Sequence, residues 1–213
     1  MEILYIILGW LLGILSPGII NRISDRYNKK ALQRIIIDEL KDLKKRLAML
    51  PIMVYPKYGK LDEKIFIWIK TQTQDFKEFE MSGDIKDEFE KQVKNKKNLN
   101  IFLEHYNSTH KKDKPAFHFK KMIISTIDSN LMNFGILDDD FLEKLLDIKF
   151  QLNAFNEEVQ SVYEYLKMTF NSNITVDNHQ IISKEIENKN LLIAEKAILI
   201  VEKINNIIYQ NKK

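Results

Sequence analysis

Histidines and carboxylates are the side chains of this sequence that could carry metal or acid–base chemistry. His105, His110 and His118 lie in one basic stretch, with Glu104 beside the first of them. A zinc site uses histidines four residues apart on a helix, or short spacings completed by further ligands. His105 and His110 are five residues apart, and the second falls in a polar segment. The sequence therefore predicts exposed or partly packed histidines and no metal site.

Three consecutive carboxylates, Asp138, Asp139 and Asp140, are a second arrangement that could bind a cation. They stand directly before a long apolar helical pattern. At that position aspartate caps the free backbone amides and complements the helix dipole. Helix capping is the favoured interpretation, and a metal site is the alternative.

The basic stretch, residues 91–121, has the composition of a nucleic-acid surface. It contains nine lysines and two acidic residues, with aromatic residues between them: Phe102, Tyr106, Phe117 and Phe119. Lysines can contact phosphates while aromatic rings stack on bases. The same aromatics also fit the spacing of a helical core, so nucleic-acid binding is the less favoured reading.

Other chemistry is excluded by composition. The chain of 213 residues has no cysteine, which rules out disulfides, thiolate ligands and a cysteine nucleophile. It has six glycines and four prolines, too few for a glycine-rich phosphate loop or a many-stranded barrel. No Gly-x-Ser-x-Gly turn or Walker loop is present. We therefore predict an all-α, non-enzymatic protein with no cofactor and no small-molecule substrate.

The first twenty residues predict a membrane anchor. From Ile3 to Ile20 the chain carries no charge, and most positions are leucine or isoleucine. Eighteen helical residues span about 27 Å, close to the roughly 30 Å of bilayer hydrocarbon. Trp10 lies within this stretch, and Gly9 and Gly13 have the small-xxx-small spacing that lets two membrane helices approach closely. Pro17 predicts a kink or a break near its end.

Basic residues follow the apolar stretch and set its orientation. They are Arg22, Arg26, Lys29, Lys30 and Arg34. Because positive flanks resist translocation, the N-terminus is expected outside and the body in the cytoplasm, at a bacterial inner membrane. These residues are also expected to lie near the anionic lipid surface. The heavy use of lysine, isoleucine and asparagine is typical of an AT-rich bacterial genome.

Four segments are predicted along the chain. They are the transmembrane anchor (1–20), a basic amphipathic helix (21–50), a helical domain (51–135) and a long helical hairpin (136–213). Pro51, Pro56 and Gly59 predict a non-helical link. Helices are expected from Ser82 and through Phe119 to Gly135, with a polar loop over 107–115.

The prediction of a helical hairpin depends on the strongest apolar periodicity of the sequence. Apolar residues recur at alternating steps of four and three on both sides of a polar break near residues 171–180. The seam positions include Leu145, Leu152, Val159, Leu166, Ile186, Asn190, Ile193, Ile200 and Ile207. A single amide on such a seam fixes register or partner number. Two heptad helices joined by a short loop predict an antiparallel, coiled-coil-like pair.

The leading hypothesis is a single-pass, membrane-anchored interaction or scaffold protein. Its expected partners are the lipid bilayer and a second copy or another protein, bound through helical surfaces. One alternative is a membrane-perturbing effector of a defence or toxin-like system, in which spans cluster through Gly9 and Gly13. The other is a membrane-tethered nucleic-acid-binding module that uses residues 91–121.

Overall fold

The computed structural model describes residues 2–73, 96–110, 117, 119–129, 131–171 and 174–211. Within these ranges the side chains of 2–9, 11–22, 73, 96–97, 110 and 131–133 are not described. All regular elements of the described ranges are helices, so the predicted all-α class is confirmed. They are α1 (Glu2–Lys57), α2 (Glu63–Thr73), α4 (Lys96–His110), α5 (Ser125–Ser129), the 3-10 helix η1 (Leu131–Ile136), α6 (Asp139–Thr169) and α7 (Val176–Gln210).

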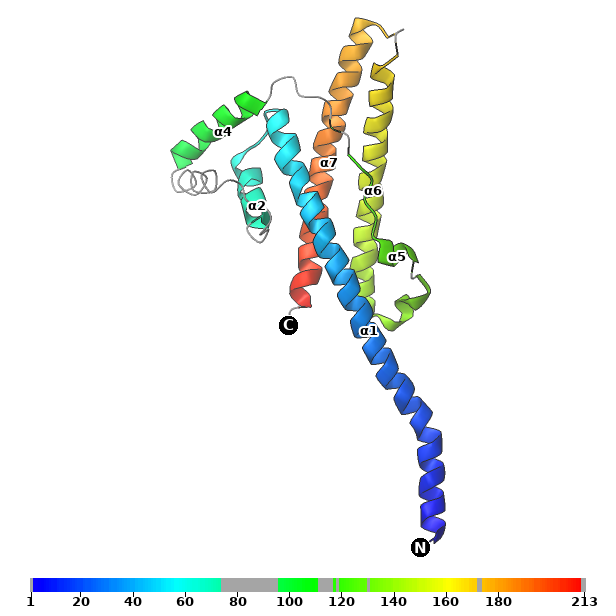
Figure 1. Ribbon diagram of the computed structural model, residues 1–213. Helices are drawn as coiled ribbons and strands as arrows, with labels where there is room; N and C mark the ends of the chain where they lie inside the picture. Colours follow the sequence, from blue (N-terminus) through cyan, green and yellow to red (C-terminus); the bar gives the residue numbers. More distant parts are fainter. Residues whose placement is uncertain are drawn as a thin grey trace.

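Three long helices build the body of the protein. Helices α6 and α7 run antiparallel and are joined by residues 170–175, and α1 lies along α7 (Figure 1). The heptad rows of the sequence lie in α6 and α7, where they face the main core. The long apolar rows therefore form an extended bundle, because each buries one stripe of its helix against its neighbours.

The main core combines residues from distant parts of the chain. Phe155 of α6, Ile200 of α7 and Leu40 of α1 are all fully buried in the same cluster. The part of α1 beyond residue 35 is therefore a structural member of the bundle. Without it, the apolar face of α7 that now packs against α1 would be exposed.

The predicted non-helical link at residues 51–59 is wrong. Helix α1 continues through Pro51 and Pro56 to Lys57, and only then does Gly59 turn the chain with a positive φ of 66°. A proline inside a helix removes one hydrogen bond and costs about 3 kcal/mol. Here both prolines, Val54 and Tyr55 are buried. Their packing offsets that cost, so tertiary contacts override the local signal.

A second, smaller cluster holds α2 and α4 near the C-terminal end of α1. Its core includes Phe66 of α2 and Leu99 and Leu103 of α4. Asn107 fastens α4 to the start of α2, because its side chain accepts from the Leu61 amide (3.2 Å) and donates to the Leu61 carbonyl (2.9 Å). Residues 107–110 are thus helical rather than part of the predicted loop. Residues 111–116 and the helix predicted from Ser82 lie outside the described residues.

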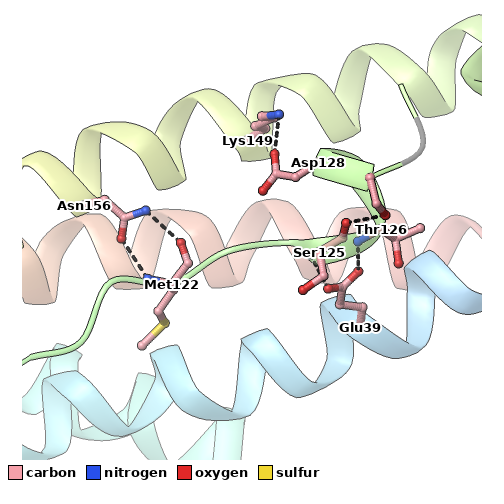
Figure 2. Close-up of polar contacts among 8 residues, drawn as sticks. Glu39, Met122, Ser125, Thr126, Asp128, Lys149 and Asn156 are labelled. Atoms are coloured by element: carbon pink, nitrogen blue, oxygen red, sulfur yellow. Dashed lines mark hydrogen bonds and ion pairs between the residues drawn. The ribbon is translucent and has the colours of Figure 1, made fainter. Parts of the chain in front are cut away.

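The helix predicted through Phe119 to Gly135 is also wrong. Residues 119–124 are not helical, α5 is five residues long, and η1 follows. The Asn156 side chain pairs with both backbone groups of Met122, donating at 2.7 Å and accepting at 2.8 Å. Glu39 of α1 accepts from the amides of Ser125 and Thr126 and so caps α5 (Figure 2). Side chains from α1 and α6 therefore satisfy backbone groups that a longer helix would have paired internally.

The N-terminal part of α1 extends beyond the bundle (Figure 1). Pro17 predicts a kink or a break; helix α1 is continuous across this residue, so it does not break there. In the part of the chain whose residues are described, no helix has both the length and the apolarity that a membrane crossing requires. Except for Trp10, whose side chain is exposed, the side chains of the predicted anchor, including Ile3 and Ile20, lie outside that part.

Candidate interaction surfaces

The residues considered for metal chemistry do not gather in the described part of the chain. His105 is exposed on α4, while the side chains of His110 and His118 lie outside that part. Asp138 occupies the N-cap position of α6 but makes no side-chain cap, and its carboxylate is bound by Lys29 and Gln33 of α1. No group of three or more histidine, aspartate or glutamate side chains with the geometry of a cation site occurs among the described residues.

Lys29 stabilises the ionised form of the Asp138 side chain. The ammonium donates to the carboxylate, and this hydrogen bond lowers the pKa of Asp138 below its usual value. The pair joins α1 to the start of α6. Lys29 thereby differs from Arg26, Lys30 and Arg34, because it points toward the bundle.

The aromatics of the predicted nucleic-acid surface are partly used inside the protein. Phe102 stacks on Tyr106 with ring centroids 5.6 Å apart and meets Phe66 edge-on at 5.9 Å. Phe117 and Phe119 stack at 5.3 Å, and the Lys57 ammonium lies 4.5 Å from the Phe117 ring. All four rings are half-buried against the core. Residues 91–95, 111–116 and 118 of the basic stretch lie outside the described part.

The remaining basic residues of α1 form an exposed row. Arg26, Lys30 and Arg34 follow one another at steps of four residues, and their side chains are exposed. In the described part of the chain, Arg26 and Lys30 have no hydrogen bond or ion pair. Arg34 lies one turn before Asp38, whose pKa is lowered chiefly by a hydrogen bond from Lys41 and to a smaller extent by Arg34. Arg22 continues the row toward the N-terminus, with its side chain outside the described part.

A row of apolar residues runs beside these cations. Ile23, Tyr27 and Ile35 are 64 %, 76 % and 56 % exposed, and Ala31 between them is also exposed. Sequence reasoning overlooked this row, although its regular step of four residues can be read from the sequence. The sequence does not show whether this row faces the bundle or solvent, because that depends on where α6 and α7 pack against α1.

The seam residues predicted for the hairpin lie in the interior of the bundle. All of them are buried except Leu166, which is half-buried against the same core. Asn190 is 0 % exposed, and its Nδ2 donates to the Tyr58 hydroxyl at 2.7 Å. Its Oδ1 is buried and has no hydrogen-bond partner in the described structure. The buried amide thus contacts the turn after α1, a partner that the heptad pattern cannot indicate.

Asn190 and Tyr58 are expected to be energetically coupled. Asn190→Leu or Tyr58→Phe alone should lower the free energy of unfolding by about 1–2 kcal/mol, because each leaves a buried polar group without its partner. The double variant Asn190→Leu/Tyr58→Phe should be at least as stable as either single variant, since both polar groups are removed. Urea denaturation of the four proteins measures the coupling. Additive losses would contradict it.

Comparison with known proteins gives no family. No protein-family model matches the chain, and neither a curated protein nor a solved structure shows significant similarity to it. A depression of about 370 Å³ on the described surface is lined by Lys121, Asn153 and Gln160 and is open to solvent. The exposed face of α1 combines a row of basic side chains with a row of apolar ones.

Proposed function

We propose that the chain is a non-enzymatic, membrane-tethered interaction protein. In this proposal residues 1–20 cross a bacterial inner membrane with the N-terminus outside, and the bundle lies in the cytoplasm. Copies pair through Gly9 and Gly13, and the bundle offers its helical surfaces to a protein partner.

The observation that carries the proposal is the continuity of α1. One helix contains the uncharged stretch Ile3–Ile20 and also the core residues Leu40 and Leu47. From Ile20 to Lys29, which pairs with Asp138 at the start of α6, the chain rises only about 14 Å. A helix inserted in a bilayer would therefore hold the bundle close to the membrane without a flexible linker.

Charge supports the assigned orientation. Glu2 is the one charged side chain before the apolar stretch, whereas Arg22, Arg26, Lys29 and Lys30 follow it within ten residues. Leucine and isoleucine contribute about −0.3 to −0.6 kcal/mol each to insertion, and eleven of them occur in this stretch. The basic flank then favours retention of the body on the cytoplasmic side.

Fractionation of cells that express the full chain or residues 21–213 tests the tether. We expect the full chain in the membrane pellet after a high-salt wash and the truncated chain in the supernatant. Both should show the same cooperative helix unfolding by circular dichroism, because the core begins beyond the deleted segment. Leu12→Lys, which places a charge at the centre of the stretch, should reduce membrane retention.

Orientation can be measured separately because the chain has no cysteine. Phe170→Cys introduces one thiol at a position that is 85 % exposed. An impermeant maleimide should label it only after the cells are opened. Recovery of the full chain in the supernatant would contradict the tether, and labelling in intact cells would contradict the orientation.

A further inference from the structure

The exposed apolar residues of α1 from residue 23 to residue 35 lie on a different side of the helix from the buried apolar residues beyond residue 35. Beyond residue 35 its buried positions, such as Ile36 and Leu40, face the bundle. Tyr27 precedes Ile36 by nine residues, which is two and a half helical turns, so Tyr27 points to the opposite side. The exposed row of Ile23, Tyr27 and Ile35 therefore cannot serve the core of its own chain.

Two cations that have no partner in the described structure, Arg26 and Lys30, lie in the same region of α1. Further along the helix, Lys41 pairs with Asp38 at 2.7 Å and Arg46 pairs with Asp42. Arg26 and Lys30, by contrast, have no ion pair among the described residues. The outward face of residues 23–35 thus combines a row of apolar side chains with a row of uncompensated positive charge.

This combination favours an anionic lipid surface over a second copy of the chain. Gly9 and Gly13 lie eighteen residues, or five helical turns, before Tyr27 and Ala31, so copies paired there turn this face of α1 toward each other. A small-xxx-small pair crosses at about −40°, however, so the two helices separate beyond the bilayer. A closer approach would set Arg26 and Lys30 against identical charges. An anionic headgroup layer instead complements the cations, while Ile23 and Tyr27 enter the interface as in amphipathic surface helices. We propose that the face of α1 formed by Ile23, Arg26, Tyr27, Lys30 and Arg34 binds anionic phospholipid headgroups. This inference rests on the proposed tether.

The three basic residues of this face are expected to contribute unequally to headgroup binding, because each lies at a different distance from the bilayer. If Ile20 marks the hydrocarbon boundary, Arg26, Lys30 and Arg34 lie about 9, 15 and 21 Å beyond it along the axis. The headgroup layer is about 5–8 Å thick, and charge is screened over about 8 Å at physiological salt. Side chains on a helix lean toward its N-terminus, here toward the bilayer. Arg26 and Lys30 therefore lie within reach, and Arg34 lies at the limit.

The full chain with Ala31→Cys, labelled with a donor dye, tests the proposal. It is reconstituted in phosphatidylcholine vesicles that contain trace phosphatidylglycerol or phosphatidylcholine with the same acceptor on one acyl chain. We expect energy transfer to phosphatidylglycerol about two- to five-fold above transfer to phosphatidylcholine at low salt, since each basic residue near the surface favours anionic lipid by about that factor. The ratio should approach one in 1 M salt.

Charge reversal locates the binding face. Arg26→Glu/Lys30→Glu should abolish the preference, whereas Arg34→Glu should keep most of it. Lys45→Glu is the matched control, because Lys45 is exposed on α1 about 37 Å beyond Ile20. An effect of Lys45→Glu equal to that of the double variant would overturn the proposal.

Three further outcomes would also overturn the proposal. A chain that floats with the vesicles but transfers equally to both lipids contradicts the lipid face and leaves the tether standing, whereas a chain that does not float contradicts the tether and the lipid face together. A disulfide between unlabelled Ala31→Cys chains under mild oxidation would assign this face to a second copy.

Discussion

Phe155→Ala is expected to lower the free energy of unfolding by about 3–5 kcal/mol, because it removes a fully buried aromatic ring from the main core. Phe155 lies midway along α6, where packing is close and the neighbouring side chains can fill the cavity only in part. The denaturant midpoint should fall while the dependence of the free energy on denaturant stays the same.

Phe150→Ala is the matched control on the same helix. Phe150 is 68 % exposed, so its removal should change the free energy of unfolding by less than about 0.5 kcal/mol. Urea denaturation of both variants under the same conditions measures the difference. Equal losses would mean that α6 does not present the face assigned to it here.

The hairpin could be predicted because its signal is local and repeated. Leu145, Leu152, Val159, Ile193 and Ile200 lie at heptad positions, and each must be buried if the helix packs along one side. No single residue decides such a pattern. A weak local preference at one position is therefore outweighed by the rest of the row.

The course of the chain around Pro51 and Met122 could not be predicted, because distant residues decide it. Pro51 and Pro56 read locally as helix breakers, yet their burial at the end of α1 keeps the helix intact. The residues around Met122 read as a helix, yet Asn156 pairs with the Met122 backbone across 34 positions of sequence. Neither contact leaves a periodic signal.

The exposed face of α1 could be predicted only in part from the sequence. The steps of four residues through Arg26, Lys30 and Arg34 are visible in the sequence, and so is the basic flank that predicts topology. The structure adds that Lys29 pairs with Asp138 and that Tyr27 points away from the bundle. The sequence shows the cluster of cations, but it does not show which of them form ion pairs within the fold. The structure supplies that distinction.

Stability is expected to fall steeply with alkaline pH, and Tyr55 is the main cause. Burial, followed by the negative charges of Glu195 and Asp62, raises the pKa of Tyr55 from 10.0 to about 12. Between these two values the unfolded chain loses the phenol proton while the folded protein retains it. Because the unfolded state then binds fewer protons, the free energy of unfolding decreases as the pH rises. A difference of two pKa units corresponds to about 2–3 kcal/mol.

Tyr55→Phe should remove this part of the alkaline loss. Tyr55 is 6 % exposed, and a phenylalanine ring can occupy the same space without an ionisable group. A residual decrease should remain, since burial also raises the pKa of Tyr58 and of Tyr106, and since a hydrogen bond to Glu158 raises the pKa of Lys189. Tyr27→Phe, at an exposed site, controls for the loss of a phenol. Urea denaturation at pH 9 to 12 measures the three proteins, and parallel curves for wild type and Tyr55→Phe would show that another group governs alkaline unfolding.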